Sequence, residues 1–156
     1  MLHRLLFNLR ARNRHGTHSP FVYRFLDKAL YTKSYKGLPP DKKLLLAAAD
    51  HFRVQRAGPE PHSGLAQWLA RERPGILWEG PPYDLFLSQT LEDIPGPGTW
   101  HPDGFLYAGG QHASEKREKW QVLLAGGTFR VVVETHAAAL LFFRPQQARE
   151  HFRIRI

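Results

Sequence analysis

The sequence predicts an α/β fold whose sheet is mostly parallel and ends in an antiparallel strand pair. Short apolar runs alternate with segments whose apolar residues recur at helical spacing, which is typical of a parallel sheet with crossover helices. Near the C-terminus two β-rich runs, 129–135 and 138–143, are separated by only two residues. Because a parallel crossover needs about a dozen residues, we expect these two runs to pair in antiparallel fashion.

Three helices are expected before the first strand. An amphipathic helix over 2–9 is indicated by leucines at helical spacing. Ser19-Pro20 is a cap and first-turn pair for a second helix, which fades near Tyr31. A third helix is predicted from Asp41, acting as its cap, to His51.

The remaining elements are bounded by Pro and Gly. A fourth helix is expected to begin after Ser63 and to end before Pro74-Gly75. A fifth spans 114–124 and is ended by Gly126-Gly127 as a left-handed cap. Short apolar runs predict four further strands, at 52–57, 76–79, 83–88 and 104–108.

Length and composition predict a single cytoplasmic domain over residues 1–156, with a basic helical N-terminal extension over 1–43 and a core over 44–156. The absence of cysteine excludes a disulfide framework, a thiolate zinc site and a cysteine nucleophile, and it fits a reducing compartment. We find neither a secretory signal nor a membrane span, and we expect no bound metal.

Charge is concentrated in the N-terminal extension. Residues 1–43 contain ten Lys and Arg but only two acidic residues, so they carry the whole formal net charge of +8. Such asymmetry indicates a surface for an anionic partner, whether RNA, an acidic protein or a phosphorylated ligand, although a solvated basic helix is an alternative. Phosphate contacts are expected from Arg4, Arg10, Arg12, Arg14, Lys33 and Lys36.

Both ends of the chain carry motifs of one family. Residues 14–23 read RHGTHSPFVY, and residues 140–156 read LLFFRPQQAREHFRIRI. These stretches resemble the two ends of a group of bacterial class I S-adenosylmethionine-dependent methyltransferases. The resemblance implies a Rossmann-like methyltransferase sheet and a helix over the QAREHF segment. It also implies that the first motif packs near the mouth of the active site, as a substrate lid formed by His15, Gly16, His18, Ser19 and Tyr23.

The same resemblance implies where a cofactor would bind. The segment ILWEGPP, 76–82, is similar to the family's second strand, so Glu79 would accept hydrogen bonds from the ribose of S-adenosylmethionine. Gly58 and Gly64 correspond to the glycine-rich turn that approaches the amino-acid portion of the cofactor. His112 lies where a rim histidine would serve as a base.

Three departures accompany the resemblance. Pro59 and Pro61 stiffen the glycine-rich turn, and Arg56-Ala57 replaces its expected acidic residue. Only three residues separate Glu79 from the strand at 83–88, so the family's third-strand unit is missing and the sheet is reduced. The acidic residues expected after the fourth and fifth strands are replaced by Ser88-Gln89 and Gly109-Gly110.

The sequence is therefore compatible with three functions. The favoured one is a diverged methyltransferase-like protein, a pseudoenzyme or weak enzyme that acts through binding or assembly. The second is a compact but active methyltransferase that uses S-adenosylmethionine. The third is an RNA-binding module built on the basic N-terminal helices. Because the missing unit would expose a sheet edge, we also expect a homodimer mate, another partner or the N-terminal helices to cover it.

Overall fold

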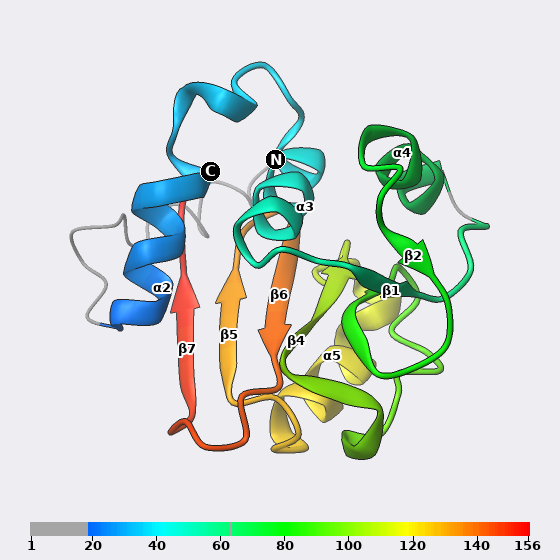
Figure 1. The fold of residues 1–156 in the computed structure, drawn as a ribbon. Coiled ribbons are helices and arrows are strands. Elements are labelled where there is room, and N and C mark those ends of the chain that lie inside the picture. The colour runs from blue at the N-terminus through cyan, green and yellow to red at the C-terminus, as the bar shows by residue number, and fades with distance from the viewer. Residues whose placement is uncertain (1–18, 63) are drawn as a thin grey trace.

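The structure, a computed structural model, describes residues 19–62 and 64–156 (Figure 1). The helix expected over 2–9, the proposed cap Ser63 and the first half of the first motif, 14–18, lie outside these residues. The same holds for the expected lid residues His15, Gly16 and His18, and for four expected phosphate contacts, Arg4, Arg10, Arg12 and Arg14. No helix in the described part is long and apolar enough to cross a bilayer.

Seven strands form one sheet in the order β2-β1-β3-β4-β6-β5-β7. Strand β6 is antiparallel to both of its neighbours, β4 and β5, and every other adjacent pair is parallel. The expected mostly parallel sheet with an antiparallel pair is thus confirmed. In chain order the strands are β1 (Arg56–Gly58), β2 (Leu77–Trp78), β3 (Tyr83–Ser88), β4 (Trp100–Gly109), β5 (Val131–Glu134), β6 (Ala138–Phe142) and β7 (Glu150–Arg153).

Three helical segments cover one face of the sheet and one covers the other (Figure 1). The first face carries α2 (Pro20–Phe25), which continues as the π-helix η2 (Leu26–Leu30), then α3 (Pro40–His51) and α4 (Gly64–Glu72). The opposite face carries α5 (Arg117–Ala125). Three short 3₁₀ turns complete the described elements: η3 (Lys33–Tyr35), η4 (Pro97–Thr99) and η5 (Ser114–Lys116).

The two helix starts predicted from caps differ in outcome. The Ser19 hydroxyl accepts a hydrogen bond from the Val22 N–H at 3.5 Å, so Ser19 caps α2 as expected. By contrast, α3 begins at Pro40 with Pro39 in the cap position, so the expectation that Asp41 is the cap is wrong. Proline fits the first turn because its missing N–H has no partner to lose there. The backbone carbonyl of Asp41 instead accepts a hydrogen bond from the Tyr107 hydroxyl at 3.1 Å.

Alternate residues of the central strands enter two separate cores. On β4, Phe105 and Tyr107 face the three-helix side, and Leu106 and Ala108 face α5. Because α5 is one short helix, it supplies few of the buried side chains of its layer, and the sheet itself and its loops supply the rest. The α5 face is therefore the less covered of the two.

The C-terminal segment forms a strand where the resemblance implied a helix. β7 pairs in parallel with β5, with Val131 opposite Glu150 and Glu134 opposite Arg153. The segment alternates polar His151 and Arg153 with apolar Phe152 and Ile154, the period of a half-buried strand. Ile154 is buried and Phe152 packs against the same core, and this side-chain burial explains the correction.

At the opposite side of the sheet, β2 is the edge strand, as expected if the third-strand unit is missing. It has two residues, and Leu77 is 52% exposed. A very short edge strand offers few unpaired backbone groups to another chain, which limits unwanted pairing. The expectation that a partner covers this edge stays a prediction.

An ion pair ties the covering helices together. Near the end of α3, Asp50 accepts two hydrogen bonds from Arg73, which follows α4, at 2.6 and 2.7 Å. The Tyr35 hydroxyl of η3 donates to the same carboxylate at 2.8 Å. Burial would raise the pKa of Asp50, but the hydrogen bonds from Arg73 and Tyr35 outweigh it and lower that pKa. Burial and the carboxylate together raise the pKa of Tyr35 to about 12.

We expect Asp50→Asn to lower the free energy of unfolding by about 1–2 kcal/mol, because the bidentate pair with Arg73 loses its charge. Urea unfolding followed by circular dichroism measures the change. Glu60→Gln is the matched control, since its carboxylate is 79% exposed and lies 4.0 Å from an equally exposed histidine. Equal effects of the two substitutions would show that the Asp50 cluster does not stabilise the fold.

Candidate functional site

The parallel strands end along one edge of the sheet. The arrows of β5 and β7 point toward the top of Figure 1. Open α/β sheets bind ligands outside the carboxyl ends of their strands. The residues that end β1, β3, β4 and β5 are Gly58, Ser88, Gly109 and Glu134. A ligand site of this kind would therefore lie along this edge.

The space beside Gly58 is filled by a side chain of the protein itself. A Cβ atom built on this residue would lie 2.4 Å from Cε1 of Tyr83, so the tyrosine ring fills the space that the glycine leaves. The ring in turn makes edge contacts with Phe86 and Trp100, at centroid distances of 5.3 and 6.2 Å. The glycine is thus accounted for by the approach of a side chain of the protein itself. Gly64, which begins α4, is exposed, and an added Cβ would meet nothing within 4 Å.

Glu79 follows β2, as expected, and is half exposed. Its carboxylate lies 3.7 Å from Nη2 of Arg56, whose Nη1 donates to the carbonyl of Gly80 at 3.2 Å. Arg56 stands where the resemblance implied an acidic residue, and it contacts the side chain expected to bind ribose. With Tyr83 over Gly58, these residues do not fit S-adenosylmethionine as the resemblance implied.

The two expected lid residues within the described part, Ser19 and Tyr23, belong to the start of α2. Ser19 is buried as the cap of α2, which accounts for it without a substrate. Tyr23 is 40% exposed on α2. Lys33 and Lys36, expected to contact phosphate, are exposed, and they line one pocket of about 370 Å³ together with Lys43 of α3.

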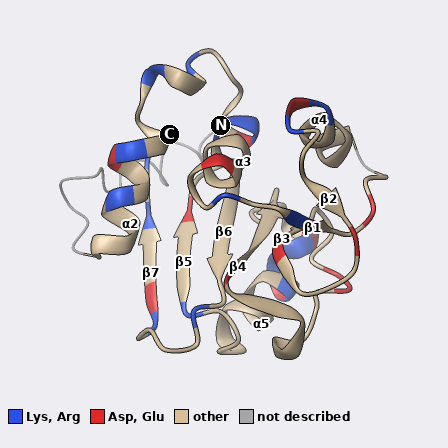
Figure 2. Ribbon diagram, in the orientation of Figure 1, with Lys and Arg blue, Asp and Glu red and all other residues tan. Residues whose placement is uncertain are grey.

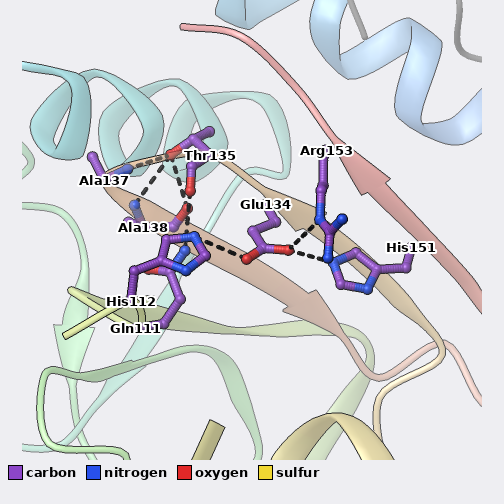
Figure 3. A network of polar contacts seen from close by, with 8 residues as sticks. All are labelled: Gln111, His112, Glu134, Thr135, Ala137, Ala138, His151 and Arg153. Atoms are coloured by element: carbon purple, nitrogen blue, oxygen red, sulfur yellow. Dashed lines mark hydrogen bonds and ion pairs between the residues drawn. The ribbon is translucent and has the colours of Figure 1, made fainter. Parts of the chain in front are cut away.

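The structure places His112 in a polar network around a buried carboxylate (Figure 3). Glu134, at the end of β5, is only 1% exposed. Its Oε1 lies 2.9 Å from Nε2 of His112, which is in the turn after β4. Its Oε2 lies 2.6 Å from Nε2 of His151 and 3.5 Å from Nε of Arg153, both on β7. One carboxylate thus joins three segments.

Electrostatics explains why a carboxylate is stable at this depth. Burial alone would raise the pKa of Glu134, but hydrogen bonds from His112 and His151 and their positive charge outweigh it and lower that pKa to about 2. Because an ionised carboxylate only accepts hydrogen bonds, Nε2 of His151 donates to it. Glu134 thereby fixes the orientation of the His151 ring, and Nδ1 of His151 has no partner within residues 19–62 and 64–156.

A second buried polar residue lies beside this network. Gln111 is 1% exposed and donates from Nε2 to the carbonyl of Thr135 at 3.0 Å. The Thr135 hydroxyl accepts from the backbone N–H groups of Ala137 and Ala138 and donates to the Ala138 carbonyl, which closes the turn between β5 and β6. Gln111 therefore anchors the turn after β4 to the turn after β5.

Sequence reasoning found His112 but missed Glu134 and His151. Glu134 is the acidic residue that follows Val131, Val132 and Val133, and an acidic residue at the end of so apolar a strand was a usable signal. The role of His151 had no such signal, because it depends on the parallel register of β7 on β5. Within the described residues no group of three His, Asp or Glu side chains is arranged to hold a metal ion.

Comparisons with protein-family models, with curated proteins and with solved structures find no match to this chain.

We expect Glu134→Gln to lower the free energy of unfolding by about 2 kcal/mol at neutral pH, because two histidines and an arginine lose their shared anion. Glu79→Gln is the matched control, since the Glu79 carboxylate is half exposed and its ion pair with Arg56 is long. The measurement is urea unfolding of both variants at several pH values.

The loss of unfolding free energy caused by Glu134→Gln should also depend on pH in a defined direction. The pKa of Glu134 is about 2 in the folded protein and about 4.5 when unperturbed, so its stabilisation is complete above about 4.5 and is lost as pH falls toward 2. The difference between the wild type and Glu134→Gln should shrink over this window. A stability difference that stays constant down to the lowest pH of this window would contradict the proposed role of the ionised carboxylate.

Proposed function

We propose that this chain is a diverged relative of the class I S-adenosylmethionine-dependent methyltransferases that acts by binding a partner and not by methyl transfer. Motifs at both ends of the chain support the relationship. The sheet supports it as well, because β2 lies at the edge that loss of a third-strand unit would leave, and the remaining strands stay contiguous.

The observation that carries the second half of the proposal is the Tyr83 ring over Gly58. A glycine-rich turn serves a cofactor by letting it approach the backbone closely, and here a side chain of the protein makes that approach. The ends of two further strands are engaged internally as well. Ser88 accepts a hydrogen bond from the Leu91 N–H at 2.9 Å, and the Gly109 carbonyl accepts one from Lys116 at 3.1 Å.

The partner that we propose is RNA, bound at the basic region. Lys33, Lys36 and Lys43 line one pocket, and none of the three forms an ion pair with a carboxylate in the described part. Figure 2 shows Lys and Arg along α2 and on the loop that follows it. Three ammonium groups around a hollow beside the N-terminus of α3 suit a phosphate, because the helix dipole adds a partial positive charge there.

A thermal-shift titration tests the first half of the proposal. S-adenosylmethionine and S-adenosylhomocysteine, at concentrations up to millimolar, should leave the Tm unchanged, because a ligand raises the Tm only when it binds the folded state. A clear rise that Glu79→Ala abolishes would contradict the proposal and would support the compact active methyltransferase instead.

Fluorescence anisotropy with a labelled single-stranded RNA tests the second half. We expect replacement of Lys33, Lys36 and Lys43 by Gln to weaken binding about tenfold or more and to reduce the dependence of affinity on salt, because fewer counterions are released. The matched control replaces the exposed residues Arg53, Arg71 and Arg117 by Gln, with the same change in net charge. An equal loss in both triple variants would argue against a site at the lysine pocket.

A further inference from the structure

The α5 face of the sheet carries a pocket of about 180 Å³ beside the Glu134 network. Its apolar floor is formed by the end of α5 and by the strands, with Leu124, Phe129, Val132 and Leu141 among its lining residues. The pocket exists because α5 is short and no other described helix extends over this part of the face. It lies on the opposite side of the sheet from α3, whose first turns border the lysine pocket.

Charged side chains form the rest of the lining. Arg130 donates from Nε to the carbonyl of Gln147 at 3.0 Å, and Arg149 donates from Nη2 to the carbonyl of Leu124 at 2.5 Å. Each guanidinium is thus anchored by one N–H, and a guanidinium has five. Glu150, which also lines the pocket, accepts a hydrogen bond from Gln147 at 3.0 Å.

His151 completes the lining, and it is the best-anchored of the polar groups. Its Nε2 is held at 2.6 Å by the buried carboxylate of Glu134, which fixes the plane of the ring. The other ring nitrogen, Nδ1, has no partner among the described residues, so it is available to a ligand. The pocket therefore combines an apolar floor, two anchored guanidinium groups and an oriented imidazole.

We propose that this pocket binds a small monocarboxylate with a compact apolar body, of the size of benzoate. The apolar body would lie on the leucine, valine and phenylalanine side chains, and the carboxylate would take hydrogen bonds from Arg130 and Arg149. Guanidinium groups recognise planar carboxylates through paired N–H donors. Because two arginines and one glutamate line the pocket, its arginines offer more positive charge than the glutamate removes, which favours an anionic ligand.

Isothermal titration of the full chain with three probes tests this inference. Benzoate has both the charge and the apolar body, benzyl alcohol keeps the body without the charge, and acetate keeps the charge without the body. We expect benzoate to bind at least about tenfold more tightly than either of the others. Equal affinities for benzoate and benzyl alcohol, or no binding of benzoate at millimolar concentration, would overturn the proposal.

Variants locate the site. Arg149→Gln changes an exposed side chain, and we expect it to weaken benzoate binding about tenfold while leaving the Tm of the free protein nearly unchanged. Arg71→Gln, an exposed arginine on α4, is the matched control and should have no effect on benzoate binding. Benzoate affinity that survives both Arg149→Gln and Arg130→Gln would place the ligand elsewhere. Since the pocket is independent of the lysine pocket, loss of RNA binding would leave this result untouched.

Discussion

The C-terminal half of the fold depends on the buried carboxylate of Glu134. A charged group at this depth is stable only if donors surround it, and the donors come from the turn after β4 and from β7. Their contacts are compatible with one register only, in which Arg153 lies opposite Glu134 and His151 lies two pairs earlier, opposite Val132. The network therefore positions β7 beside β5, and it also aligns the histidine that lines the pocket on the α5 face.

On the same face of the sheet, aromatic side chains fill the space that α5 alone does not cover. Rings of Tyr83, Phe86, Trp100 and Phe129 form a chain of edge contacts with centroid distances between 5.3 and 6.4 Å. Aromatic residues bury large areas each, so a few of them close a layer that holds only one helix. The same packing places Tyr83 against Gly58.

Local patterns predicted the elements whose contacts are local or strongly periodic. Ser19-Pro20 located the start of α2, and the two-residue connection between the β-rich runs identified β5 and β6 as an antiparallel pair. Apart from the cap of α3, the prediction was wrong where a distant partner decides the structure. The segment that contains His151 is a strand because β5 offers an unpaired edge, and four alternating residues are too short a signal to reveal it. The setting of Glu134 depends on the same non-local register.

The two parts of the carboxyl edge of the sheet thus differ in the residues that they carry. Around β1 and β3, aromatic rings and internal hydrogen bonds satisfy the groups that would meet a ligand in an open site. Around β5 and β7, the buried carboxylate of Glu134 orients the imidazole of His151, and the second ring nitrogen of that imidazole is free. The strand order of a sheet does not by itself determine the chemistry at its edge. The pocket proposed for a small ligand accordingly lies on the α5 face beside β5 and β7, where it includes His151, and not at the ends of β1 and β3.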